Sequence, residues 1–69
     1  MEARNERFRR VADSRGSRIQ REIRMIGSLA DRERYDYSVE DINDLFKPIE
    51  IAIRETRDAF IKSIPTEED

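Results

Sequence analysis

Residues 37–42 read Tyr-Ser-Val-Glu-Asp-Ile, and this short stretch decides how the chain is organised. Ser38 is followed three residues later by Asp41, the spacing of a capping box, in which the serine oxygen accepts a free backbone N–H of the first helical turn. Tyr37 and Ile42 flank the cap at the spacing of a hydrophobic staple. The acidic residues of this turn also suit the positive end of the helix dipole. A helix is therefore predicted to begin at Ser38.

The apolar residues after the cap recur every three or four positions, which is the period of one helix face. They are Ile42, Leu45, Ile49, Ala52, Thr56 and Ala59, with Phe46, Ile53 and Phe60 beside them. This pattern predicts a helix over about 38–63. Pro48 removes one backbone hydrogen bond and kinks or breaks a helix. Because the apolar phase is the same before and after Pro48, one helix bent near Leu45 is favoured over two short helices. Residues 65–69 are expected to form a flexible acidic tail.

A second apolar stripe lies upstream and predicts a helix over about 2–30. Its members are Phe8, Ala12, Gly16, Ile19, Ile23, Ile26 and Ala30, with Val11 and Leu29 beside them. Residues 31–37 lose the period and form the connection. The predicted fold is all-α, an antiparallel two-helix hairpin occupying residues 1–64 as one domain. One partner helix covers only part of so wide a stripe, so we expect two hairpins to pair into a four-helix bundle.

Several short motifs at the corner and along the helices are similar to those of a group of small bacterial helical-hairpin proteins without an assigned function. These are Ile26-Gly27-Ser28-Leu29-Ala30, Tyr35-x-Tyr37-Ser38, Asp41-Ile42, Leu45-Phe46 and finally Phe60. The resemblance spans about residues 8–60 and implies the hairpin, with no catalytic residues to transfer. Gly16 and Pro48 depart from the pattern of that group.

Composition restricts the functions that the chain can have. The 69 residues include no cysteine and no histidine, which removes thiolate and imidazole metal ligands together with the commonest general base. No serine has a histidine base, and neither glycine belongs to a phosphate-binding loop. We therefore expect no enzyme activity, no metal and no cofactor. No apolar run is long enough to cross a membrane and no signal peptide is visible, so a cytoplasmic location is expected.

Charge is distributed unevenly along the chain. Charged residues make up 43% of it and the net charge is −2, yet residues 1–34 are basic and residues 35–69 are acidic. The helical period of the apolar residues argues against disorder in spite of this charge content. Opposite charge on the two halves favours two elements that attract each other, within one chain or across a dimer.

Four arginines define a basic face of the first predicted helix, on the side away from the apolar stripe: Arg7, Arg10, Arg18 and Arg21. Such a face can follow a phosphate backbone. The alternative is a solvated face with local ion pairs, for example Glu6 with Arg10, Arg9 with Asp13 and Arg18 with Glu22.

Three further residues are candidate contact residues because the predicted core does not use them: Tyr35, Ile51 and Ile61. The leading hypothesis is a non-enzymatic protein–protein interaction module, which acts as a homodimer or through a protein partner, with no membrane and no small-molecule substrate. The alternative is a small nucleic-acid-associated regulatory protein that uses the basic face.

Overall fold

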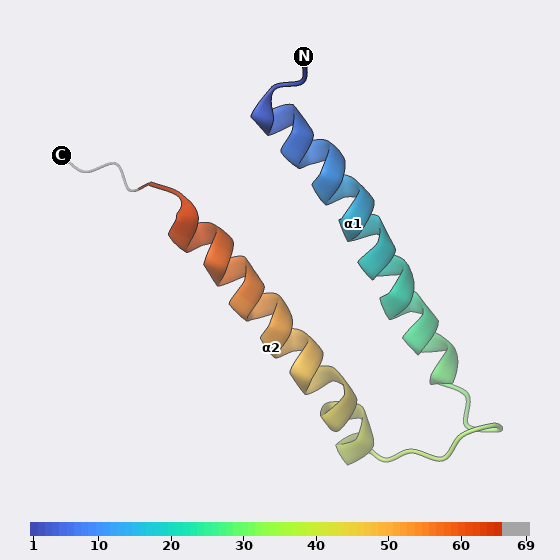
Figure 1. Cartoon of the computed structure of the whole chain (residues 1–69). Helices are drawn as coiled ribbons and strands as arrows, with labels where there is room; N and C mark the ends of the chain where they lie inside the picture. Colours follow the sequence, from blue (N-terminus) through green and yellow to red (C-terminus); the bar gives the residue numbers. More distant parts are fainter. Residues whose placement is uncertain (66–69) are drawn as a thin grey trace. The chain divides into compact units, whose positions relative to one another are not determined.

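A computed structural model describes residues 1–65, which form two α-helices and one short 3-10 helix without any strand (Figure 1). Helix α1 spans Arg4–Ile26, η1 spans Gly27–Leu29 and α2 spans Val39–Ser63. The predicted all-α class is confirmed. The chain divides into two compact units, Met1–Asp36 and Tyr37–Asp69, and each is described by itself. The antiparallel packing of the helices stays a prediction. Most of the predicted tail lies outside the described residues.

Helix α1 begins two residues later than predicted, because its first turn is closed around Ala3. The Glu6 carboxylate accepts the Ala3 N–H at 3.0 Å, and the Arg7 N–H donates to the Ala3 carbonyl at 2.9 Å. Alanine has no side-chain acceptor, so only the acidic half of a capping box is present. The acid at this position also satisfies the helix dipole.

The α-helix ends at Ile26 rather than at the predicted Ala30, because the last turn tightens into η1. The Ser28 hydroxyl donates to the Met25 carbonyl at 2.7 Å, and the Ala30 N–H donates to the Gly27 carbonyl at 3.1 Å. Such i→i+3 bonds satisfy carbonyls that an α-helix end leaves open. At this end the predicted helix was right to within one residue in extent and wrong in the type of its final turn.

The predicted connection contains an ordered turn built on Asp31. Its carboxylate accepts the Glu33 N–H at 3.0 Å, and its carbonyl accepts the N–H groups of Arg34 and Tyr35 at 3.1 and 2.9 Å. Aspartate side chains commonly hold a turn in this way. The loss of helical period at residues 31–37 thus marks a specific turn, whose aspartate the sequence analysis did not single out.

Helix α2 begins with the predicted capping box, which is confirmed in both directions. The Asp41 N–H donates to Ser38 Oγ at 3.1 Å, and the Ser38 N–H donates to Asp41 Oδ2 at 2.9 Å. The Ser38 hydroxyl also donates to Asp41 Oδ2 at 3.0 Å. Tyr37 is half-buried, while its predicted staple with Ile42 stays a prediction.

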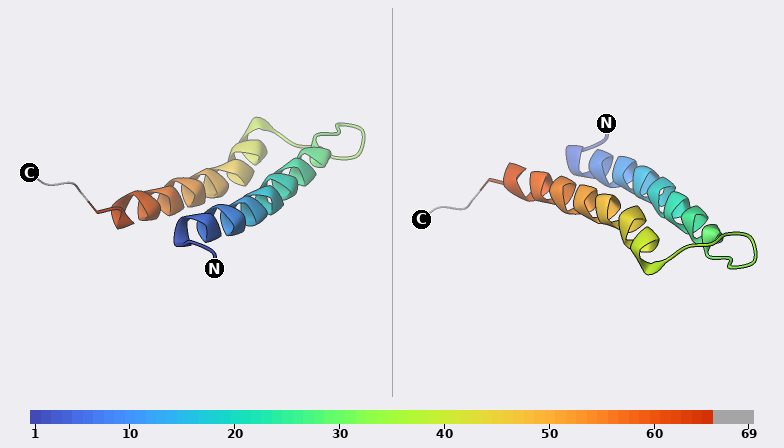
Figure 2. Two further views of the ribbon diagram at one scale, coloured as in Figure 1. Left: turned by 90° about the horizontal axis from the view of Figure 1, so that it is seen from above. Right: turned by 90° about the horizontal axis from the view of Figure 1, so that it is seen from below.

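Pro48 lies inside α2 without ending it. Figure 2 shows α2 as one uninterrupted ribbon from its yellow-green first turn to its red last turn. One helix over Val39–Ser63 agrees closely with the predicted 38–63 and excludes the two short helices. The bend expected near Leu45 stays a prediction.

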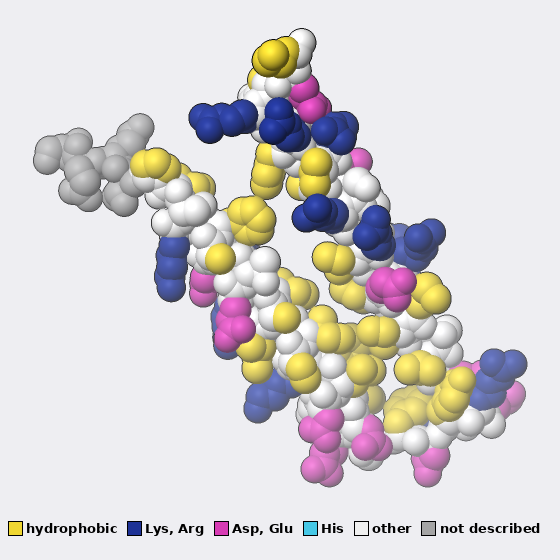
Figure 3. Space-filling model, in the orientation of Figure 1, with side chains coloured by type: hydrophobic (Ala, Val, Ile, Leu, Met, Phe, Trp, Pro, Cys, Tyr) yellow, Lys and Arg dark blue, Asp and Glu magenta, His cyan; other side chains and the backbone are white. Residues whose placement is uncertain are grey.

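Neither helix has a closed core of its own, since no side chain within residues 1–65 is fully buried. Side chains of the apolar stripes keep large exposed fractions, such as 57% for Ile19 and 53% for Ile53. Both helices carry rows of apolar side chains on their surface in the space-filling view (Figure 3). Among the described residues, these exposed apolar faces are the strongest indication of an interface with another molecule.

Removing the cap serine should weaken the fold. We expect Ser38→Ala to lower the free energy of unfolding by about 1 kcal/mol, because two of the three hydrogen bonds between Ser38 and Asp41 use the hydroxyl. Thermal unfolding followed by circular dichroism measures this loss. Ser14→Ala, a change in the interior of α1, is the matched control and should not lower the melting temperature, because alanine favours a helix interior. Equal melting temperatures for all three proteins would contradict the role of the cap.

The cap also predicts an acid-dependent loss of stability. Hydrogen bonds from the Ser38 backbone N–H, and then from its hydroxyl, hold the pKa of Asp41 below its ordinary value of 3.8. The ionised carboxylate therefore stabilises the fold fully above the unfolded pKa, and this contribution is lost as pH falls through the lowered folded pKa. Wild type should melt higher than Asp41→Asn at neutral pH, and the difference should shrink below pH 3.8. A difference that is independent of pH would contradict this assignment.

Candidate interaction surfaces

Glu2 forms ion pairs with the two arginines at the N-terminal end of the basic face of α1. Arg10 donates from Nε to Glu2 Oε2 at 2.9 Å and from a terminal nitrogen to Oε1 at 3.0 Å, a two-pronged ion pair. Arg7 Nε lies 4.0 Å from the same Oε1. The bond to Glu2 raises the pKa of Arg10 above its ordinary value. One glutamate therefore draws two of the four predicted arginines together.

The other two predicted arginines lie further along α1, and both are exposed. Within residues 1–65, neither Arg18 nor Arg21 has an ion-pair partner. They leave two fixed positive charges open to an anionic group.

The local ion pairs expected along this face are wrong within the described chain. Glu6 bonds to the Ala3 N–H instead of Arg10, and Arg10 reaches back eight residues to Glu2. The N-terminal helix end offers unsatisfied N–H groups, which bind a carboxylate better than a solvated arginine does. Arg9 with Asp13 and Arg18 with Glu22 are likewise not paired among residues 1–65.

The sequence analysis missed Arg15, which lies on the apolar stripe of α1. It stands four residues after Val11 and four before Ile19, and residues with that spacing are neighbours on a helix surface. Its side chain is exposed. The spacing of Arg15 can be read from the sequence, but the predicted stripe was defined by its apolar residues, so Arg15 was left out. A long cationic side chain at this place can lie along apolar surface and present its charge at the edge.

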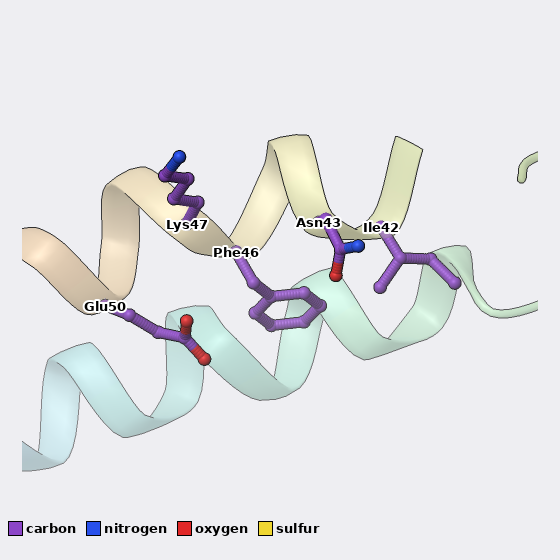
Figure 4. A pocket seen from close by; sticks show the side chains of 5 residues that line it. All are labelled: Ile42, Asn43, Phe46, Lys47 and Glu50. Carbon is purple, nitrogen blue, oxygen red and sulfur yellow. The ribbon is translucent and has the colours of Figure 1, made fainter. Parts of the chain in front are cut away.

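A groove lies on α2 over residues 42–50, about two and a half turns that start one turn into the helix, and it is lined by Ile42, Asn43, Phe46, Lys47 and Glu50. In Figure 4 the side chains of Ile42, Phe46 and Glu50 leave the same side of α2, while Lys47 is directed away. The groove therefore combines an apolar floor with one carboxylate at its rim. Such a surface suits an apolar side chain of a helix with a basic residue nearby.

The three remaining candidate residues differ in exposure. Ile61 is 60% exposed and Tyr35 is 44% exposed, and they belong to different units. Ile51 is half-buried although it lies off the apolar stripe. Lys47 and Glu55 stand four residues on either side of it, and their stems can cover it. Ile51 and Ile61 are ten residues apart, about 15 Å along the helix. Of the three, Ile61 is the most open apolar surface.

Charge is polarised along α2. Its first half, residues 40–50, carries four acidic residues and one lysine, and its second half, residues 54–62, carries three basic and two acidic residues. Acidic side chains gather at the start of α2 in Figure 3. This order follows the helix dipole, which favours anions at the N-terminus and cations at the C-terminus. It also makes the two ends of the helix electrostatically complementary to each other.

Metal sites and membrane-spanning helices are absent from the part of the chain that the structure describes. Residues 1–65 contain no group of three acidic side chains placed to hold a metal ion, and no helix among them combines the length and apolarity needed to cross a bilayer. Comparisons with protein-family models, curated proteins and solved structures found no similar protein.

Proposed function

We propose that this chain is a non-enzymatic protein–protein interaction module, which folds as an antiparallel helical hairpin and pairs with a second copy into a four-helix bundle. The observation that carries the proposal is the pair of long apolar faces without any fully buried residue among positions 1–65. Monomeric soluble proteins rarely expose large contiguous apolar surface, and such surface commonly marks an interface. The interaction surfaces are the apolar faces of α1 and α2.

Size supports the same proposal. A chain of 69 residues without cysteine has neither the volume for a large core nor disulfides to reinforce it. Oligomerisation is the remaining common source of stability for so small a helical chain. The apolar stripe of α2 is also wider than a single neighbouring helix covers.

Concentration-dependent melting tests the proposal. If folding is coupled to dimer formation, the melting temperature should rise steadily as protein concentration increases, because association stabilises the folded state by mass action. Circular dichroism over a hundredfold range of concentration measures this. A cooperative melt at the same temperature throughout the range would contradict a folded state that depends on self-association.

The open arginines favour a second candidate function, in which the basic face binds a nucleic-acid backbone. Arg18 and Arg21 are exposed and, within residues 1–65, have no ion-pair partner. Against it stands the acidic balance of the whole chain, which weakens the field around the arginines.

Replacing the four arginines of the basic face with glutamine should leave folding and partner binding nearly unchanged if the face is only solvated. We expect weak or no binding of either protein to duplex or single-stranded DNA in fluorescence anisotropy at low salt. Binding by wild type that falls steeply between about 50 and 200 mM salt and vanishes in the quadruple variant would establish the second function instead.

A further inference from the structure

The apolar face of α2 contains two series of residues spaced by seven. One series is Phe46, Ile53 and Phe60, and the other is Ile42, Ile49, Thr56 and Ser63. The steps between them alternate between three and four residues, as for the two core positions of a coiled-coil heptad. Each chain therefore carries a seam that another helix can fit along about 32 Å of its length.

The two edges of this seam differ in character. One edge carries Glu50 and Arg57, which follow Phe46 and Ile53 by four residues each. Both are exposed, and neither has an ion-pair partner within residues 1–65. Seven residues separate them, whereas ion pairs within one helix form at spacings of three or four. The other edge carries only Leu45, Ala52 and Ala59.

We propose that a second copy of this chain docks on the seam with its α2 antiparallel, so that Glu50 of each copy pairs with Arg57 of the other. The inference rests on the proposed function and specifies its interface. In an antiparallel pair like edges face each other, which sets the edge of Glu50 and Arg57 against itself. In a parallel pair that edge would face the uncharged edge and the two ions would stay unpaired. Edge charges commonly determine helix orientation in this way.

This register also matches the sizes of the core residues. When Glu50 lies beside Arg57 of the second copy, Phe60 faces Ile49 and Ile53 faces Thr56. A two-fold axis repeats every contact, as an interface between identical chains requires. Phe46 then faces Ser63, so a large residue meets a small one.

The polarised charge of α2 favours the same orientation. An antiparallel pair sets the acidic first half of each helix beside the basic second half of the other, whereas a parallel pair sets like charge beside like charge. Figure 4 adds that Glu50 projects from the side of α2 that carries Ile42 and Phe46, as the pairing needs. The uncharged residues of the opposite edge leave that side to a helix outside the pair.

Charge exchange between full-length chains tests this register. In Glu50→Arg, and separately in Arg57→Glu, both ion pairs become repulsive, and the dimer dissociation constant should rise about tenfold. An equimolar mixture of the two variants should form a heterodimer as tight as the wild-type dimer, because each reversed charge then meets its opposite. The double variant should also recover wild-type affinity. Sedimentation velocity with one variant fluorescently labelled measures all four cases.

Lys62→Glu and Asp58→Arg are matched controls, since they change the charge equally but lie off the edge of the seam. They should not alter the dissociation constant more than twofold, and the effect of the edge variants should shrink at 1 M salt. A wild-type dimer whose single variants dissociate no more readily and do not prefer each other would overturn this register while leaving the proposed function intact. A monomeric wild type would overturn both.

Discussion

Replacing Ile49 with aspartate should abolish self-association and the cooperative thermal transition together. Ile49 is half-buried on the apolar face of α2 and belongs to one of its two series of residues spaced by seven. In the dimer, where this face is covered, the aspartate variant loses about 2 kcal/mol of stabilisation from burying the isoleucine side chain. It also incurs the larger free-energy penalty of enclosing a charge without a partner. For a small chain with a total stability of the usual 5–15 kcal/mol, that loss removes most of the folded dimer. Size-exclusion chromatography with light scattering and thermal melts measure both effects.

Ile61→Asp is the matched control for this experiment. Ile61 is 60% exposed and lies off the apolar stripe, so the same substitution there should leave association nearly unchanged. If Ile61→Asp dissociates the protein and Ile49→Asp does not, the interface does not lie on the apolar face of α2 that is proposed here.

Replacing Pro48 with alanine should stabilise the protein. Proline inside a helix lacks the N–H that would bond to the carbonyl four residues earlier, here that of Asp44, and costs up to about 3 kcal/mol relative to alanine. Because Pro48 lies inside a continuous helix, alanine can restore that bond without changing the apolar phase. The melting temperature should rise by at least about 5 °C, the shift that 1 kcal/mol gives in a domain of this size.

The opposite result at Pro48 would be equally informative. A lower melting temperature for Pro48→Ala, with weaker self-association, would mean that the shape imposed by proline is needed for packing. Lys47→Ala, one residue earlier in the same helix, is the control. It also replaces a residue with alanine in the helix interior, but it leaves the proline in place.

Sequence reasoning placed α2 to within a residue because its start is determined locally. Ser38 and Asp41 satisfy each other within a single turn, so no contact from elsewhere in the chain is needed. Pro48 was correctly placed inside one helix because the apolar phase does not change across it. Local hydrogen-bonding chemistry of this kind can be identified from spacing alone.

The misplaced ends of α1 have a different cause. Its first turn is closed by the Glu6 carboxylate, which accepts the backbone N–H of Ala3, and an alanine at this position carries no sequence signature of a cap. Its last turn tightens into η1 through the Ser28 hydroxyl, which leaves the apolar period unchanged. The ion pairs along the basic face were misplaced for a related reason. Several acids compete for each exposed arginine with small energy differences, and spacing does not decide between them.

The candidate surfaces were predicted only in part. Apolar stripes and the arginine face follow from the helical period, whereas Arg15 was overlooked because the stripe was defined by its apolar members. Ile51 lies off the predicted core face and was a candidate contact residue, yet it is half-buried. Exposure depends on how flexible neighbours lie, which the spacing of residues does not fix.

Sedimentation equilibrium of the full chain at micromolar concentration tests the central claim most directly. The claim is that the apolar faces of α1 and α2 are covered by a second copy. The protein should sediment with about twice the monomer mass of 8.2 kDa and dissociate on dilution. A species of 8.2 kDa at every concentration, with a cooperative unfolding transition at high temperature, would contradict the account.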